Sequence, residues 1–310
     1  MATVAQGISS SRQHLTGSVL ALIAAIGFSA KAILVKLAYV DAVDAVTLLA
    51  LRMAFSLPFF VVAAVLSGRK QQSQPLVFRD KVALIGLGLI GYYFASLLDF
   101  IGLQYISAGL ERMILFLYPT MVVLISAVIL RQRVGRIARL ALLISYAGIA
   151  LVYWHDMRIS QHDTLTGALL VFGSALAYAI YLVGAGHAIS RVGAARFTAY
   201  VMIVACVACL AQFALTRPMT ELQLPAKIHV LAAAMAVFST VLPAFLLAAA
   251  MHRIGSMRTS LIGSVGPVST ICLAYVFLGE PLSLVQFVGS ILVLAGVLTI
   301  SLRQPQSAKR

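Results

Sequence analysis

The stretch from Gly102 to Leu130, GLQYISAGLERMILFLYPTMVVLISAVIL, places Glu111 beside Arg112 inside a run of residues apolar enough to cross a lipid bilayer. An ionised side chain near the middle of a bilayer costs roughly 3 kcal/mol or more, so such charges normally face the interior of a helix bundle or a wet cavity. Pro119 follows about two turns later, removes one backbone hydrogen bond and bends or opens the helix. The stretch therefore predicts a membrane helix whose charged and bent face points into a bundle.

The rest of the chain has the composition of a protein embedded in a membrane. Its 310 residues are 62% hydrophobic and only 10% charged. Ten apolar runs approach the roughly 20 residues that span a hydrocarbon core, and they lie at about 18–38, 46–66, 82–101, 107–130, 138–154, 166–188, 197–215, 228–251, 257–278 and 283–302. The first run is longer than the apolar core of a signal peptide, so we interpret it as a retained helix. The fold class that follows is an all-α polytopic membrane protein with ten transmembrane helices.

The loops between these runs differ in charge from one side of the membrane to the other. With the N-terminus in the cytoplasm, sixteen lysines and arginines fall on the inner side and three, Arg158, Arg217 and Lys227, fall on the outer side. Short loops rich in Lys and Arg remain in the cytoplasm. We therefore expect both termini to be cytoplasmic.

The net charge of +14 raises the question of a nucleic-acid partner. The basic residues occur in short runs between apolar segments rather than on an amphipathic stripe or in an RNA- or DNA-binding motif, so we expect no nucleic-acid binding. Cys206, Cys209 and Cys272 lie inside apolar runs, and no second cysteine pair completes a zinc site. The sequence thus indicates no metal and no cofactor, and it leaves the oligomeric state open.

The two halves of the chain resemble each other. A shift of 148 residues aligns Ile106 with Ile254, Ala108 with Ser256, Pro119 with Pro267 and Gly148 with Gly296, and a shift of 150 aligns Gly17 with Gly167, Leu20 with Leu170, Ala25 with Ala175 and Phe28 with Tyr178. Each copy, 17–152 and 166–302, holds five predicted helices. Because five is odd, the second copy enters the membrane from the opposite side. This predicts an inverted repeat, with a binding site near the midplane where the copies meet.

Apart from arginines at the cytoplasmic ends of the runs, the charged residues inside the predicted helices all belong to the first copy: Lys31, Lys36, Arg52, Asp99, Glu111 and Arg112. The matching positions of the second copy hold Tyr181, Gly186, Met202, Leu247, Thr259 and Ser260. The five-helix unit therefore does not require these charges, which favours a functional role for them. Four basic residues against two acidic ones leave a positive surplus that suits a ligand with a carboxylate. Lys36 and Asp99 lie near span ends, where we expect them to reach the membrane interface.

These features together are similar to those of the EamA family of the drug/metabolite transporter superfamily, which are ten-helix carriers built from two five-helix repeats. The residues that carry the resemblance are GSVLALIAAIGFSAKAILVKLA and GALLVFGSALAYAIYLV at the start of each copy, LRMAFSLPFF in the second helix, YISAGLERMILFLYPTMVVLISAVIL with RIGSMRTSLIGSVGPVSTICLAYVFLGEPL, and the last helices ending in YAGIALV and LAGVLTI. They cover about residues 17–302. The resemblance implies a secondary carrier in a cell inner membrane, often an exporter of small metabolites or amino acids.

Glu111 and Arg112 are neighbours, and on a helix their side chains point about 100° apart. They therefore need separate partners. We expect Glu111 to pair with Lys31 or Arg52, which leaves Arg112 for a small-molecule substrate. A Glu111 carboxylate that takes up and releases a proton would couple transport to a proton gradient. A carboxylate held by a base instead stays ionised and does not titrate.

The residues that we expect to bind substrate or to form a gate are Lys31, Arg52, Glu111, Arg112, Tyr118, Pro119, Tyr181 and Pro267. The Pro119 and Pro267 match indicates paired hinges. One alternative is an intramembrane enzyme, which would need a nucleophile with a base, paired aspartates or a metal set within the spans. The runs contain no convincing set of this kind, so we expect no catalytic residue and no enzyme. A non-transporting membrane subunit is the other alternative.

Overall fold

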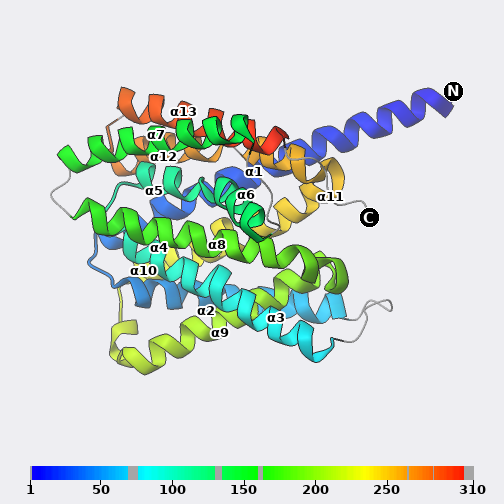
Figure 1. Ribbon diagram of the computed structural model, residues 1–310. Helices are drawn as coiled ribbons and strands as arrows, with labels where there is room; N and C mark the ends of the chain where they lie inside the picture. The colour runs from blue at the N-terminus through cyan, green and yellow to red at the C-terminus, as the bar shows by residue number, and fades with distance from the viewer. Residues whose placement is uncertain are drawn as a thin grey trace.

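The computed structural model describes residues 2–68, 76–129, 135–159, 163–263, 265–281 and 283–303, and within these ranges the chain forms helices and connecting turns with no strand (Figure 1). The first half contains α1 (Ala2–Tyr39), α2 (Ala45–Gly68), α3 (Phe78–Gly88), the π-helical turn η1 (Leu89–Phe94), α4 (Ala95–Gly102), α5 (Ala108–Leu115), α6 (Tyr118–Ile129) and α7 (Arg136–Ile159). The second half contains α8 (Thr164–Val192), α9 (Ala194–Thr216), the 3-10 turn η2 (Met219–Leu222), α10 (Ala226–Ala236), the π-helical turn η3 (Val237–Val241), α11 (Leu242–Gly263), α12 (Gly266–Leu278) and α13 (Leu284–Arg303).

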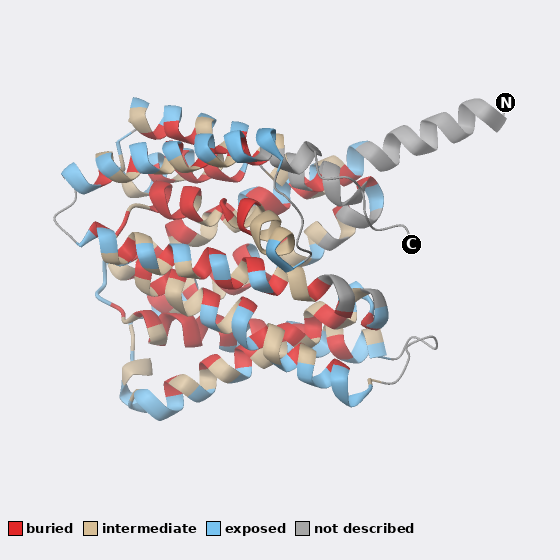
Figure 2. Cartoon of the chain, viewed as in Figure 1, coloured by how far each residue is buried: buried red, intermediate tan, exposed pale blue. Residues whose placement is uncertain are grey.

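Eight segments of the described helices are long and apolar enough to cross a membrane, and Gly266–Leu278 and Leu284–Thr299 are shorter apolar helices. Buried and exposed residues alternate along most of the long helices (Figure 2), and many of the exposed ones are large and apolar. One face of such a helix packs on its neighbours while the other meets lipid. The all-helical, multi-pass membrane class expected from composition is confirmed. The described residues supply eight full-length spans where the sequence predicted ten.

Two helices extend beyond the ends that hydropathy predicted. α1 begins at Ala2 rather than near residue 18, and α7 continues to Ile159 rather than ending near residue 154. In α7 the guanidinium of Arg158 lies 5.1 Å from the ring centroid of Trp154, one turn earlier. This cation–π contact between neighbouring turns stabilises the extra turn of helix. Hydropathy locates the apolar part of a helix, not its polar extension.

The span predicted at 107–130 is two helices in the structure. α5 ends at Leu115, Phe116 and Leu117 form a turn, and α6 begins at Tyr118 with Pro119 as its second residue. α12 likewise begins at Gly266 with Pro267 as its second residue. The missing N–H of proline costs little in the first turn of a helix, where backbone N–H groups have no intrahelical partner. Both prolines therefore begin new helices rather than kinking continuous ones.

The break that the sequence predicted between residues 251 and 257 is absent, because α11 runs from Leu242 to Gly263. The segment MHRIGSMR at 251–258 contains Gly255 as its one helix-weakening residue. A single glycine costs only about 1 kcal/mol in a helix interior, so it does not end the helix here.

Two π-helical turns interrupt the α-helices at related positions. η1 begins at Leu89 and η3 begins at Val237, which lies 148 residues later. This is the shift that aligns Pro119 with Pro267. π-Helical turns are rare and often accompany functional sites. A second feature, invisible in the hydropathy pattern, thus recurs at the same spacing.

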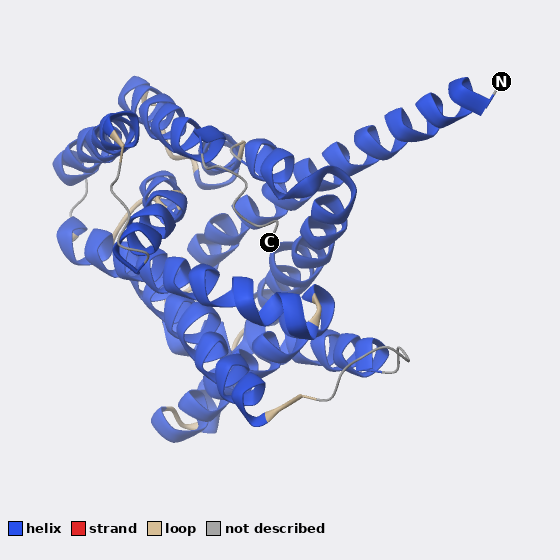
Figure 3. Ribbon diagram, turned by 45° about the vertical axis from the view of Figure 1, so that its right-hand side comes forward, coloured by secondary structure: helices blue, strands red, loops and turns tan. Residues whose placement is uncertain are grey.

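Helices of the two halves pack against each other in matched pairs. α1 packs along α11 and α12, while α8 packs along α4 and α6; α2 packs along α9, and α7 along α13 (Figures 1 and 3). At the α7–α13 contact a Cβ on Gly148 would lie 2.7 Å from the carbonyl oxygen of Gly289, and a Cβ on Gly296 would lie 2.3 Å from that of Ala141. Small residues allow the backbones of membrane helices to approach this closely. The halves are therefore interleaved.

Candidate functional site

Lys31 of α1 holds two buried carboxylates. Its ammonium nitrogen lies 2.9 Å from Oε1 of Glu111 on α5 and also forms an ion pair with Oδ2 of Asp99 on α4. Glu111 is 0% exposed and Asp99 is 3% exposed, so neither carboxylate is solvated by bulk water. Among the described residues, Asp99 Oδ1 and Glu111 Oε2 have no hydrogen-bond donor. Two acceptor oxygens are therefore left facing the interior of the bundle.

This geometry answers two sequence predictions. Glu111 pairs with Lys31, one of the two partners expected for it. The expectation that Asp99 reaches the membrane interface was wrong, because Asp99 lies in the buried ion pair. Its position near the end of an apolar run suggested the interface, but α4 packs along α8 inside the bundle. The sequence did contain a signal for this ion pair. An acidic residue within an apolar run needs a basic partner, and Lys31 lies within another apolar run of the same half.

Arg52 of α2 lies between the two halves. It is 6% exposed, its Nε donates to Oγ1 of Thr240 in η3 at 3.0 Å, and its guanidinium carbon lies 5.2 Å from the ring centroid of Phe100. Phe100 follows Asp99 on α4. Among the described residues, Arg52 Nη1 has no acceptor. The hydroxyl of Thr240 donates to the carbonyl of Met235, five residues earlier, at 3.0 Å.

Arg112 points to a different neighbour from Glu111, as the 100° between adjacent helical side chains predicts. Its guanidinium packs against Gly266, where an added Cβ would lie 2.9 Å from Nη2. The Ser29 hydroxyl of α1 lies 2.8 Å from the carbonyl oxygen of Ala25 in its own helix and 3.0 Å from that of Gly266, so the two carbonyls share its proton. Arg112 Nε is buried with no acceptor among the described residues. The first residue of α12, Gly266, therefore contacts both α1 and Arg112 of α5, and the buried Pro267 follows it directly. We name Lys31, Arg52, Asp99, Glu111 and Arg112 the ionic cluster.

Four tyrosines form a second group, which we name the aromatic wall: Tyr92 of η1, Tyr118 of α6, and Tyr178 and Tyr181 of α8. Ring centroids lie 5.1 Å apart for Tyr92 and Tyr181, 5.3 Å for Tyr118 and Tyr178, and 5.6 Å for Tyr178 and Tyr181. Tyr181 fits against Gly91, where a Cβ would lie 2.4 Å from the Tyr181 Cβ. The wall thus contains both predicted tyrosines, and Tyr92 and Tyr178 join them through contacts that the sequence does not show.

The N-terminus of α5, which carries Glu111 and Arg112, is held by three polar contacts. Ser107 Oγ accepts from the backbone N–H of Leu110 at 3.1 Å. Asp156 of α7 accepts from the N–H of Ser107 at 3.2 Å, and Glu280 accepts from the N–H of Ala108 at 3.3 Å. Carboxylates at a helix N-terminus satisfy otherwise unpaired N–H groups and complement the helix dipole.

Glu280 belongs to the turn between α12 and α13, in which Gly279 adopts φ +66°. Burial raises the pKa of the Glu280 carboxyl, and its hydrogen bond from Ala108 acts in the opposite direction. The turn after α12 in the second half therefore positions the charged helix of the first half.

The cysteines and histidines form no metal site in the ranges that the structure describes, where three or more His, Cys, Asp or Glu side chains do not converge. Cys206 and Cys209 are buried on α9, and Cys206 Sγ lies 3.7 Å from Met53 Sδ. They pack as small apolar residues.

A bundle of apolar helices in which buried charges meet at the contact between two interleaved halves defines the class of this protein as a multi-pass membrane protein with an internal polar site. The chain belongs to the EamA-like transporter family, whose pattern matches residues 15–154 and, a second time, residues 165–302. It is therefore a membrane transporter.

Two relatives agree with this assignment, and one solved structure has a similar fold. The chain is 30% identical over 292 residues to the uncharacterized transporter YcbK of Bacillus subtilis, covering 90% of each protein. It is 27% identical over 227 residues to the uncharacterized transporter YyaM of the same organism, covering 72% of this chain and 74% of that protein. A solved crystal structure matches 92% of this chain and 96% of its own with a TM-score of 0.65 at 18% identity, which shows a shared fold.

Proposed function

We propose that this transporter is a secondary carrier of a cell inner membrane that exports a small metabolite bearing a carboxylate, such as an amino acid. The observation that carries the proposal is that, among the residues that the structure describes, buried donors and acceptors of the ionic cluster have no partner. Arg52 Nη1 and Arg112 Nε are donors, and Asp99 Oδ1 and Glu111 Oε2 are acceptors. A buried polar group without a partner costs about 1–3 kcal/mol, so a solute that pairs with these atoms is favoured at this place.

The charge of the cluster supports a zwitterionic or singly anionic solute. Lys31, Arg52 and Arg112 are three cations, and Asp99 and Glu111 are two anions, so one positive charge is left over. Guanidinium groups bind carboxylates through charge-assisted hydrogen bonds. The two free carboxylate oxygens suit an ammonium group on the same solute. An amino acid satisfies both sets of atoms.

The mechanism we propose is alternating access between two inverted five-helix repeats, 17–152 and 166–302. It is supported by the π-helical turns and the helix-starting prolines, which recur at a spacing of 148 residues. It is also supported by the packing, because α1 lies along α11 and α12 of the second half while α8 lies along α4 and α6 of the first half. Inverted repeats offer two related ways to open one site. The sixteen-to-three distribution of basic residues supports cytoplasmic termini.

We also propose proton coupling, and we assign it to Lys31 because its ammonium pairs with both Glu111 and Asp99. One ammonium that is shared between two carboxylates does not hold both of them ionised. A proton on Glu111 would remove one of these two anions and increase the positive charge facing the solute. Uptake of a proton and binding of a carboxylate would then favour each other.

Counterflow tests this function. The purified protein is reconstituted in vesicles loaded with an unlabelled amino acid, and uptake of the labelled amino acid is followed for a panel that includes carboxylate-free amines. We expect counterflow of at least one carboxylate-bearing solute by the wild type and its loss in Arg112→Ser and Glu111→Thr, which carry the residues of the matching positions in the second half. Transport of carboxylate-free amines alone would overturn the substrate class. Absence of counterflow for every solute would favour a non-transporting subunit.

A further inference from the structure

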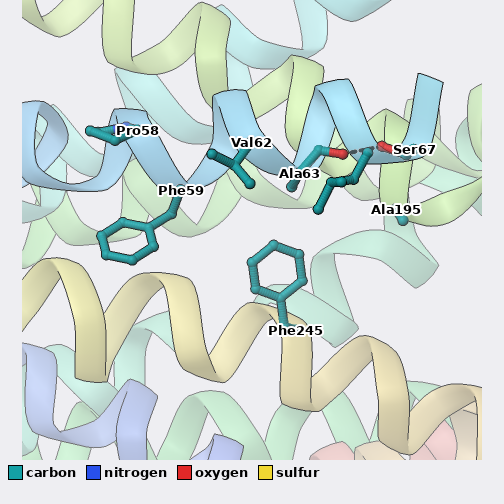
Figure 4. Close-up of a pocket in the computed structure, with 8 residues that line it drawn as sticks. Pro58, Phe59, Val62, Ala63, Ser67, Ala195 and Phe245 are labelled. Atoms are coloured by element: carbon teal, nitrogen blue, oxygen red, sulfur yellow. Dashed lines mark hydrogen bonds between the residues drawn. The ribbon is translucent and has the colours of Figure 1, made fainter. Parts of the chain in front are cut away.

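A groove of about 580 Å³ lies between α2 and α11, with the first turn of α9 at one end (Figure 4). Its lining residues are Pro58, Phe59, Val62, Ala63, Leu66, Ser67, Ala195 and Phe245. Ser67 carries the one side-chain hydroxyl in this set, and that hydroxyl donates to the carbonyl of Ala63 in its own helix. The groove therefore offers a solute no free polar partner and differs in chemistry from the ionic cluster.

The groove opens toward the hydrocarbon of the bilayer. Phe59, Val62 and Leu66 are 46%, 56% and 59% exposed, and they lie in the membrane span Ala45–Gly68. Phe245, 38% exposed, belongs to the span Ala226–Leu247 and lies 6.2 Å from the ring of the fully buried Phe60. The Phe245 ring thus lines the groove and packs on a buried ring of α2. What enters it from the membrane is hydrocarbon.

Two arginines lie beyond the lining residues in the chain, on the side of Ser67 and Ala195. α2 and α11 run in the same direction past the groove, toward Ser67 and Ala195 (Figure 4). Arg196 follows Ala195, and its guanidinium carbon lies 5.6 Å from the ring centroid of Tyr200. Arg253 is exposed on α11, eight residues beyond Phe245 and so about 12 Å further along the helix. Its Nη1 donates to the carbonyl of Ala249 at 3.0 Å, which leaves its other nitrogen atoms for a ligand. An apolar slot with two arginines beyond one end suits an amphiphile with an anionic head.

We propose that this groove is a binding site for one anionic phospholipid, with an acyl chain against Phe59, Val62 and Phe245 and the phosphate at Arg196 and Arg253. The groove separates α2 from α11, and the Arg52–Thr240 hydrogen bond joins α2 to η3, which leads directly into α11. A bound acyl chain therefore sets the separation of two elements that meet at the ionic cluster. Lipid composition would in this way affect transport without any contact between lipid and solute.

Tryptophan quenching by brominated lipid tests the site directly, because the chain has a single tryptophan, Trp154. In the Trp154→Phe background, Phe245→Trp places the fluorophore in the groove and Ile291→Trp places a control on the exposed face of α13. The full chain is reconstituted in phosphatidylcholine vesicles that contain either dibrominated phosphatidylglycerol or dibrominated phosphatidylcholine. We expect phosphatidylglycerol to quench the groove tryptophan more strongly, and both lipids to quench the control equally.

Removing charge should abolish this preference. Arg196→Gln and Arg253→Gln should each reduce the apparent affinity for phosphatidylglycerol about fivefold and leave quenching by phosphatidylcholine unchanged. Native mass spectrometry of delipidated wild-type protein is an independent measurement, and it should retain one phosphatidylglycerol in preference to phosphatidylcholine. Equal quenching of the groove tryptophan by both lipids, together with no retained phosphatidylglycerol, would overturn the proposal.

Discussion

Lys31 balances two buried carboxylates at once, so the ionic cluster depends on this residue more than on any of its other members. Removing one partner of a buried ion pair typically costs 3–5 kcal/mol, because an uncompensated charge remains in a poorly solvated place. Replacing all the charged partners by neutral groups of similar shape is often far less costly. The cluster can therefore be tested for function separately from stability.

We predict that Lys31→Met destabilises the protein by about 3 kcal/mol. Lys31→Met combined with Asp99→Asn and Glu111→Gln should recover most of this loss, since no uncompensated charge is left. Both variants should lose transport. Unfolding in detergent measures stability, and counterflow measures transport. A triple variant as unstable as Lys31→Met, or one that transports normally, would contradict this account.

Glu280 lies in a turn outside the membrane spans, and its carboxyl group should make the stability of the protein depend on pH. Burial raises its pKa above the ordinary value of 4.5, so the folded state holds the proton more tightly than the unfolded state. Its stabilising contribution is therefore fully present below pH 4.5 and is lost as pH rises through the folded pKa. Glu280→Gln should match the wild type in acid and become the more stable protein as pH rises.

The matched control is Glu280→Ala, which removes the acceptor for the N–H of Ala108. It should be less stable than Glu280→Gln by about 1 kcal/mol across the pH range. Thermal unfolding in detergent from pH 4 to pH 8 provides the comparison. If the wild type gains stability relative to Glu280→Gln as pH rises, the carboxylate is the favoured form and the assigned direction is wrong.

At the scale of elements, the break between α5 and α6 and the start of α12 are where the bundle changes helix direction next to the site. Pro119 cannot donate to a carbonyl one turn earlier, so α5 and α6 do not merge into one helix. Tyr118 of the aromatic wall directly precedes Pro119, and Gly266, which Arg112 contacts, directly precedes Pro267. A change of either break therefore moves a residue of the site.

We predict that Pro119→Ala and Pro267→Ala change transport more than stability. Alanine supplies the missing N–H and favours a continuous helix, which should bias the carrier toward one facing state. In a background that lacks Cys206, Cys209 and Cys272, single cysteines on the two sides should then react unequally with a membrane-impermeant thiol reagent. Unchanged reactivity and transport in both variants would leave the prolines as packing features only.

At the scale of the whole molecule, polar contacts link the two halves on one face. The loop after α1 contacts the segment around η2 through Asp41 with Lys227 at 2.7 Å and Asp44 with Arg217 at 2.9 Å. These pairs are partly exposed and contribute at most about 1 kcal/mol each. The distribution of basic residues predicts that this face is the outer one, and the alternating access proposed above would require the halves to separate there.

Charge reversal tests whether these pairs act as an outer latch. Asp44→Lys should shift the carrier toward the outward-open state, and Asp44→Lys with Arg217→Glu should restore the wild-type distribution. The reactivity of a single cysteine in place of Thr47, in the cysteine-free background, reports the opening. A double variant that behaves like Asp44→Lys would indicate that the pair does not link the halves during transport.

The orientation of the chain in the membrane can be tested with reporter fusions. Reporter fusions after Ser73 and Arg136 should read cytoplasmic, and a fusion after Ser160 should read periplasmic. A periplasmic signal after Ser73 would contradict the orientation derived from the basic residues.

The sequence alone determined the features that a membrane imposes locally. Each backbone group in lipid must be satisfied within its own helix, so hydropathy identified the apolar helices. The cost of buried charge selected Glu111, Arg112, Lys31 and Arg52 as site candidates. The internal match at 148 residues indicated that Pro119 and Pro267 play related parts.

Tertiary structure decided which helix faces meet, since this depends on packing and rotation that local sequence does not encode. In the folded protein the partner of Glu111 is Lys31 rather than Arg52, and Asp99, which was expected at the membrane interface, pairs with the same lysine. It also set the π-helical turn at Leu89–Phe94 that places Tyr92 in the aromatic wall. Hydropathy is blind to such a turn, because one extra residue per turn changes the direction of side chains without changing their polarity.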